Sequence, residues 1–122
     1  MGTHCALGVK LPDGKITGCY VHFDGATMRE RIEQFIREKT TTGLVMVITK
    51  AQLSGGLRSF YSLSRDLKTR ETEFLDDDTP YVISDLNWEE DHFGTYYKYL
   101  VDYETGKISA WCMHDGEMRE YE

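Results

Sequence analysis

The segment from Gly18 to Gly25, with the sequence GCYVHFDG, most constrains what this chain can fold into. It alternates between apolar and polar residues and ends on His-x-Asp-Gly, which is typical of a strand that stops at a turn. Successive strand side chains point to opposite faces, which divides the segment into a core set, Cys19, Val21 and Phe23, and a polar set, Tyr20, His22 and Asp24. The polar set gathers where the strand ends.

An amphipathic helix is predicted directly after this strand. Met28, Ile32, Phe35 and Ile36 recur at helical spacing, and Thr27 with a Glu three residues later forms a capping box. The pattern predicts a helix over residues 28–39 that covers one face of the sheet. Residues 40–43 interrupt it, and the β-branched content of residues 44–49 favours a strand there.

Two hairpins are predicted at the ends of the chain. Residues 3–11 and 15–23 flank a Pro-Asp-Gly turn, and residues 96–103 and 108–113 flank a turn at Gly106, followed by residues 117–122 as a further extended segment. In the first hairpin, a three-residue loop places His4 opposite His22. A two-residue loop at Asp13-Gly14 sends His4 to the opposite face.

These elements indicate one α+β domain over residues 1–122, with a mainly antiparallel sheet and one or two helices on one face. The length of 122 residues suits a single domain, and no apolar run approaches the roughly 20 residues of a membrane helix. The opening residues lack a secretion signal. The three cysteines are odd in number and are not spaced as metal ligands, which favours reduced thiols. We therefore expect a cytoplasmic protein.

Charge is distributed unevenly along the chain. Residues 1–70 carry eleven Lys and Arg against six Asp and Glu, whereas residues 71–122 carry three against fifteen. Between positions 71 and 91 there is no basic residue, which disfavours direct nucleic-acid binding and favours a partner protein with a basic surface. The residues predicted to bind it are Glu73, Asp76, Asp77, Asp78, Glu89, Glu90 and Asp91. A solvated acidic loop without a partner is the alternative.

The order of elements resembles a widespread group of small uncharacterised proteins of tailed bacteriophages. Their signature Tyr-Cys-His-Trp-Asp-Gly matches residues 20–25, with Val21 and Phe23 in place of the Cys and the Trp. The likeness covers about the first 60 residues and the C-terminal hairpin, including Trp111. It implies a phage origin, the host cytoplasm as location, and a helix rather than a strand near residues 44–50.

Tyr20, His22, Asp24 and Arg58 are the predicted ligand-binding residues. A nucleotide-sized anion is the expected ligand, and the loop Ser54-Gly55-Gly56 offers backbone N–H groups for a phosphate. With His4, the His22/Asp24 pair could instead bind a metal or act as a general base. A purely structural role in fixing the turn is the third interpretation.

No nucleotide-binding, hydrolase or zinc-protease motif occurs in the sequence. The sequence therefore predicts a non-enzymatic protein, without metal or cofactor, that inhibits or sequesters a host component as a host-defence antagonist. It does so through the acidic surface or through a nucleotide-sized pocket, and a second copy of the chain is a further expected partner. The alternative is a small phosphodiesterase or nucleotidase that uses the His22/Asp24 junction.

Overall fold

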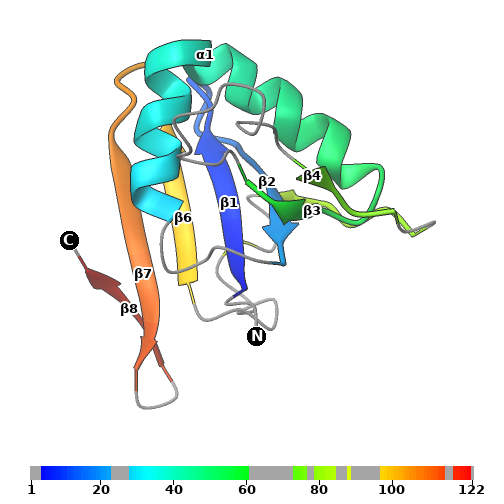
Figure 1. Ribbon diagram of the computed structural model, residues 1–122. Helices are drawn as coiled ribbons and strands as arrows, with labels where there is room; N and C mark the ends of the chain where they lie inside the picture. Colours follow the sequence, from blue (N-terminus) through cyan, green and yellow to red (C-terminus); the bar gives the residue numbers. More distant parts are fainter. Residues whose placement is uncertain are drawn as a thin grey trace.

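The computed structural model describes residues 4–22, 28–60, 73–76, 79–84, 88, 97–114 and 117–121. They form a helix and a mixed β-sheet, so the chain has an α+β fold as its sequence predicts (Figure 1). The elements in chain order are β1 (Cys5–Lys10), β2 (Ile16–Val21), α1 (Met28–Gln52), β3 (Leu57–Ser59), β4 (Glu73–Phe74), β5 (Ile83–Ser84), β6 (Tyr97–Asp102), β7 (Ile108–His114) and β8 (Glu117–Tyr121).

The sheet order is β4-β3-β2-β1-β6-β7-β8, and β5 pairs with β2 beside β3. Most of the pairings are antiparallel, but β1 pairs with β6 and β2 pairs with β3 in parallel. The sheet is therefore mixed, and the two predicted hairpins are joined side by side through their parallel inner strands β1 and β6. Helix α1 connects β2 to the parallel strand β3, as a crossover between parallel strands must.

The first hairpin closes with the three-residue loop. The N–H of Leu11 donates to the Lys15 carbonyl over 2.8 Å, and the N–H of Gly14 donates to the Leu11 carbonyl over 2.9 Å. Gly14 has a φ of 86°, which a glycine adopts without strain. Cys5 pairs with Val21, and this register places His4 opposite His22. The register required for the two-residue loop is not formed.

The second hairpin, β6–β7, has its turn where the sequence predicts it. The Asp102 carboxylate accepts the backbone N–H groups of Glu104 and Thr105 over 2.9 and 3.1 Å, and Gly106 has a φ of 75°. These hydrogen bonds, first that from Thr105, lower the pKa of Asp102. The predicted strand after this hairpin is also present, because β8 pairs antiparallel with β7.

The first half of α1 follows the predicted pattern. Met28, Ile32 and Phe35 are buried in the main core and Ile36 packs against it, while Glu33 and Arg37 are exposed. The same core holds Cys19 and Val21 from β2, so the predicted inner face of this strand is confirmed. Phe23 lies outside the described residues.

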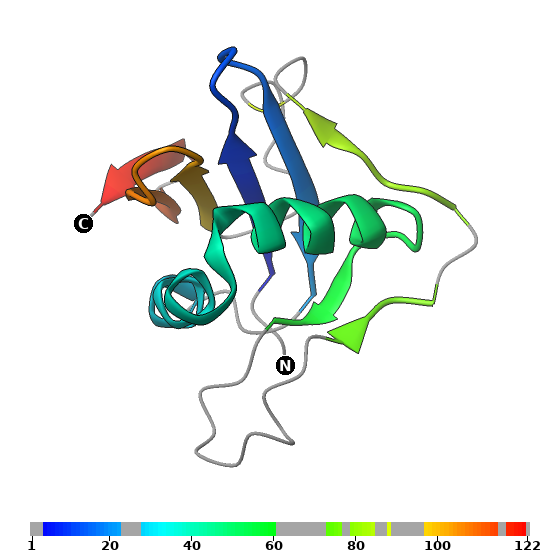
Figure 2. The ribbon, with the colours of Figure 1, turned by 90° about the horizontal axis from the view of Figure 1, so that it is seen from above.

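The predicted strand over residues 44–49 is wrong, because this segment is the second half of α1. Thr40 breaks the helix with a φ of 68° and a ψ of 170°, and its side-chain oxygen accepts the N–H of Gly43 at 3.4 Å as a cap for the second half. The two halves run in different directions: the first is seen end-on in Figure 2 and the second lengthwise across the strands.

Tertiary packing overrides the strand propensity of residues 44–49. Leu44, Ile48 and Ala51 recur at helical spacing and are all fully buried, whereas Met46 is 69% exposed. A strand would place Leu44, Met46 and Ile48 on the same face. The apolar stripe of the helix therefore decides the conformation, and the helix implied by the phage resemblance is the one that forms. No described helix is apolar and long enough to cross a membrane.

Replacing Thr40 by Gly is expected to stabilise the protein. A β-branched residue at this φ and ψ costs of order 1–3 kcal/mol, and exchanging a Thr cap for Gly costs only a few tenths of a kcal/mol. We expect Thr40→Gly to raise the free energy of unfolding in urea by about 1 kcal/mol. The matched control, Arg37→Gly in the exposed interior of the same helix, should lower it by about 1 kcal/mol. A loss of stability in Thr40→Gly as large as in the control would contradict the strained backbone.

Candidate functional site

The face of the sheet opposite α1 carries a second, smaller apolar cluster. Its buried residues are Ala6 from β1, Ile83 from β5 and Trp88, with Ile16, Leu100 and Trp111 packed around them. Gly8 of β1 and Gly18 of β2 are paired at its centre. A Cβ on Gly8 would lie 2.9 Å from the Trp88 ring, and one on Gly18 would lie 3.3 Å from the Ile83 side chain. Ile83 and Trp88 belong to residues 71–91, which we call the acidic segment. The glycine pair therefore lets these two side chains lie directly on the sheet.

Lys98 fixes Trp88 in this position. Its side chain is only 5% exposed, and its ammonium donates a hydrogen bond to the Trp88 backbone carbonyl. The same ammonium lies 5.3 Å from the centre of the Trp88 ring, in cation–π geometry. Trp111 meets the Trp88 ring edge-on at 6.4 Å. The acidic part of the sequence is thus fastened to the body of the domain at Ile83 and Trp88.

His4 and His22 meet beside this cluster, on the same face of the sheet. Their rings are stacked, with centroids 4.6 Å apart and planes inclined by 27°. Nδ1 of His4 contacts the backbone carbonyl of His22 at 2.5 Å, and because a carbonyl only accepts, this nitrogen carries a proton. A neutral His4 therefore has its acceptor nitrogen at Nε2. The register predicted for the three-residue loop has brought the two imidazoles together.

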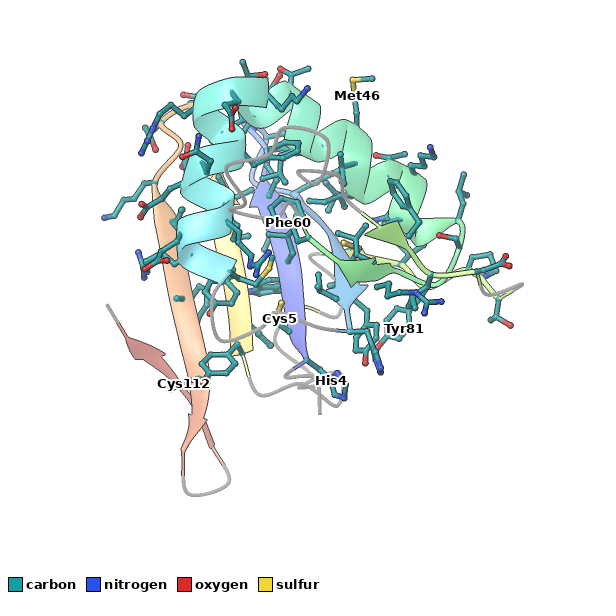
Figure 3. All side chains as sticks on the ribbon, in the orientation of Figure 1. His4, Cys5, Met46, Phe60, Tyr81 and Cys112 are labelled. Carbon is teal, nitrogen blue, oxygen red and sulfur yellow. The ribbon has the colours of Figure 1, made fainter. Side chains whose placement is uncertain are left out.

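Two tyrosines extend the stacked pair into a continuous cluster of four rings. The Tyr20 hydroxyl and Nδ1 of His22 share a hydrogen bond of 2.9 Å, and the Tyr20 ring lies 5.7 Å from that of His4. Tyr81 stacks on Tyr20 at 6.1 Å and keeps 36% of its surface exposed. Burial, together with the nearby Cys5 and Tyr81, raises the pKa of Tyr20. Figure 3 labels His4 and Tyr81 near the end of the sheet where β1 begins. We call His4, Tyr20, His22 and Tyr81 the ring cluster.

Arg58 lies next to the ring cluster in the sheet. The N–H of His22 donates to the Leu57 carbonyl over 2.8 Å, and Leu57 pairs with Val21. Leu57 is buried in the main core, so the following residue, Arg58, emerges on the opposite face, which is that of His22. Arg58 is exposed.

The loop before β3 is a helix cap rather than a phosphate-binding loop. The N–H groups of Ser54 and Gly56 both donate to the Ala51 carbonyl, over 3.1 and 2.8 Å, so they satisfy the C-terminal end of α1. Gly56 has a φ of 129°, and a Cβ there would lie 2.4 Å from the Tyr20 carbonyl oxygen. The loop thus brings Arg58 close to β2, but the predicted phosphate contacts with its backbone are wrong.

Gln52, at the end of α1, links this helix to β2 and to the segment that contains Tyr81. Its side-chain nitrogen donates to the Gly18 carbonyl at 2.7 Å and to the Thr17 hydroxyl at 3.0 Å. Its backbone carbonyl accepts the N–H of Tyr81 over 2.9 Å. Because this buried amide is hydrogen-bonded to β2 while its carbonyl holds Tyr81, the position of Tyr81 on Tyr20 is set by the end of the helix.

Of the predicted acidic surface, the structure describes two residues. Asp76 is exposed, and none of the described Lys or Arg side chains forms an ion pair with it. The chain is fixed on both sides of it, where the N–H of Leu75 donates to the Gly56 carbonyl over 3.0 Å and that of Tyr81 to Gln52. Glu73 lies in β4, where only its backbone is described. The other predicted residues, Asp77, Asp78, Glu89, Glu90 and Asp91, lie outside the described residues.

The described part of the chain contains no group of three His, Cys, Asp or Glu side chains placed to hold a metal ion. Asp24, the third ligand of the hypothetical His4, His22 and Asp24 set, lies outside the described residues. Burial raises the pKa of the Cys19 thiol far above its usual range, so this cysteine is a neutral core residue.

The sequence predicts some of the neighbours in this arrangement and misses others. The structure brings Tyr20 and His22 together, and it places Arg58 on the same face of the neighbouring strand. Tyr81 was missed, because its contact with Tyr20 joins segments about sixty residues apart in the chain. The role of Trp88 as an anchor was also missed. Gly8 and Gly18, two glycines within strands, were the signal in the sequence that another segment lies close to the sheet.

Comparison with known proteins gives no relative: no family model matches the chain, and neither a curated protein nor a solved structure is similar to it. The phage resemblance stays a prediction from the sequence.

Replacing Gly8 by Ala should displace Trp88. The added methyl group overlaps the indole, and overpacking of this kind costs about 1–3 kcal/mol. We expect a loss of this size in the free energy of unfolding and a red shift of tryptophan emission as the ring becomes hydrated. Gly43→Ala, in the helix, is the control: its Cβ would lie 3.3 Å from the Cβ of the exposed Lys39, so its stability should change by no more than about 1 kcal/mol in either direction. Unchanged emission in Gly8→Ala would contradict the close contact.

Proposed function

We propose that this protein is a non-enzymatic binding protein that sequesters a small, ring-containing anion of the nucleotide class through the ring cluster and Arg58. The observation that carries the proposal is the cluster of four rings, which consists of two stacked pairs joined by tilted contacts and opens to the surface at Tyr81. Aromatic side chains of this kind stack on nucleobases. Arg58 adds a guanidinium on the same face, where it can pair with a phosphate.

The proposal places this activity in an infected bacterial cell, where removal of a host nucleotide would antagonise a defence response. The resemblance of residues 20–25 to a phage signature supports this context. Binding is favoured over turnover because the sequence carries no nucleotide-binding or hydrolase motif. A nucleotidase would consume its ligand, so product analysis of the same mixtures separates the two activities.

Calorimetry with a panel of nucleoside mono-, di- and triphosphates and cyclic nucleotides tests this proposal. We expect at least one to bind, and Arg58→Gln and Tyr81→Ala each to weaken binding about tenfold to a hundredfold, as loss of a charge-assisted hydrogen bond or a stacked ring does. Arg37→Gln, which removes the same charge from the exposed side of α1, is the control and should bind normally. The proposal is wrong if no nucleotide produces a heat of binding and none shifts the NMR signals of the ring cluster.

A second candidate function is capture of a basic host protein by the acidic segment. The specific observation in its favour is Asp76, which is exposed and without an ion pair among the described residues, on a segment held at Leu75 and Tyr81. Leu53 follows Gln52, and Val82 follows Tyr81. Their side chains are 71% and 54% exposed and could supply apolar contact with a partner.

Neutralising Asp76, Asp77 and Asp78 as Asn tests this second function. Proteins captured from a bacterial lysate at low and high ionic strength are identified, and the affinity of any basic protein found is measured against salt. The triple variant should bind more weakly and lose most of the salt dependence. Glu30, Glu33 and Glu104, all exposed, changed together to Gln form the control with the same net charge. If both triple variants bind with the same affinity as the wild type, the acidic surface does not bind the basic protein.

A further inference from the structure

The two edges of the sheet differ in length and regularity. At one edge, β4 has two residues, and its register with β3 is interrupted by an irregularity. At the other edge, β8 has five residues and follows β7 without interruption from the Ala110–Tyr121 pair to the His114–Glu117 pair. Among the strands that the structure describes, β8 pairs with β7 alone, and it lies on the outside of the sheet in Figure 1, away from the second half of α1. A regular edge of this kind can bind a further strand.

Charge is the main feature that limits which strand can bind to β8. Natural edge strands are usually protected by Pro, by a bulge, by short length or by charged residues. The sequence of β8, Glu-Met-Arg-Glu-Tyr, contains no Pro, and its register with β7 has no bulge. Three of its five residues are charged, and they carry both signs. Opposite charges that face each other across two strands are stabilising and like charges are destabilising, so this edge selects its partner by charge.

The register with β7 assigns each residue of β8 to a face of the sheet. Ala110 of β7 is buried in the main core, on the α1 face, and residues paired in register share a face. The residues of β8 on the α1 face are therefore Glu117, Arg119 and Tyr121. Trp111 packs against the second apolar cluster, so Met118 and Glu120 lie on the opposite face. The α1 face of β8 thus carries one charge of each sign, two positions apart.

Symmetry limits how two copies of β8 can pair with each other. A two-fold axis perpendicular to the sheet makes the two strands antiparallel and keeps every residue on its own face, so one residue lies opposite itself. With Glu117, Arg119 or Glu120 on the axis, two like charges face each other, which is unfavourable. With Tyr121 on the axis, no other residue of β8 lies opposite a residue of β8. With Met118 on the axis, Glu117 of each copy lies opposite Arg119 of the other, and both pairs are attractive.

We propose that two copies of this chain form a dimer by antiparallel pairing of their β8 strands, in the register centred on Met118. Backbone hydrogen bonds continue the sheet from one copy into the other, as in other complexes formed by strand addition. The two Glu117–Arg119 pairs on the α1 face fix the register, and the two Met118 residues add apolar contact on the face that carries Trp111. This interface uses no residue of the ring cluster, so it is independent of the proposed function.

The first experiment measures the monomer–dimer equilibrium of the purified protein by sedimentation. Glu117→Arg turns two attractive pairs into two repulsive ones and should weaken the wild-type dimer about tenfold or more, as should Arg119→Glu. The double variant Glu117→Arg, Arg119→Glu restores both pairs and should dimerise like the wild type. An equimolar mixture of the two single variants should form a mixed dimer for the same reason. Glu104→Arg, an equal change of charge at an exposed position of the β6–β7 turn, is the control and should dimerise normally.

The second experiment tests the register by disulfide cross-linking between copies of a Cys112→Ser variant. Residues directly opposite each other in antiparallel strands have Cα atoms about 4.5–5.5 Å apart, and a disulfide spans about 4.4–6.8 Å. Met118→Cys should therefore cross-link two copies under oxidising conditions. Glu120→Cys, on the same face, is the matched control: the two copies of this residue are four positions apart along the strands, about 13 Å, and should not cross-link.

Each outcome bears directly on the dimer. A wild type that stays monomeric at the highest soluble concentration overturns the proposal, and so does a dimer that Glu117→Arg leaves unchanged. Cross-linking of Glu120→Cys instead of Met118→Cys overturns the register. Loss of the dimer in each charge variant, its return in the double variant and cross-linking of Met118→Cys support the proposal. Circular dichroism checks the fold of every variant, and the cross-linking test does not depend on the charge variants.

Discussion

The antiparallel pairing of β1 with β2 is the constraint on which the rest of the structure depends. Its register, fixed by the Leu11–Lys15 hydrogen bond, sends Cys5, Leu7, Cys19 and Val21 into the main core. A slip of one residue would turn these side chains outward. The same register stacks His4 on His22 and pairs Gly8 with Gly18 on the other face. The core and the candidate site are therefore two results of one pairing.

Local signals were sufficient for most of the fold. Both hairpins and the first half of α1 follow from turn residues and short-range periodicity, which act within a few positions of the chain. The second half of α1 did not, because its β-branched residues favour a strand and only burial of Leu44, Ile48 and Ala51 against the sheet decides otherwise. The parallel pairing of β1 with β6 joins residues about ninety positions apart, and nothing in either strand specifies it.

The candidate site was predictable where it depends on alternation within a strand, and not where it depends on distant segments. Tyr20 and His22 were placed on one face from sequence alone, and the position of His4 followed once the loop length was known. Tyr81 is held by the backbone of Gln52, and Arg58 by the close approach of Gly56 to β2. Such contacts arise from tertiary packing, so residue type and spacing carry little trace of them.

The parallel pairing of β1 with β6 has a consequence for the synthesis of the chain. Strand β1 leaves the ribosome before its partner β6, which follows about ninety residues later. At translation rates of about 5–20 residues per second, the inner edge of the nascent N-terminal hairpin stays unpaired for roughly 5–20 s. An unpaired edge of mostly apolar residues is a template for wrong association. Final assembly of this domain therefore waits for its C-terminal hairpin, and chaperones have that interval in which to protect the growing polypeptide.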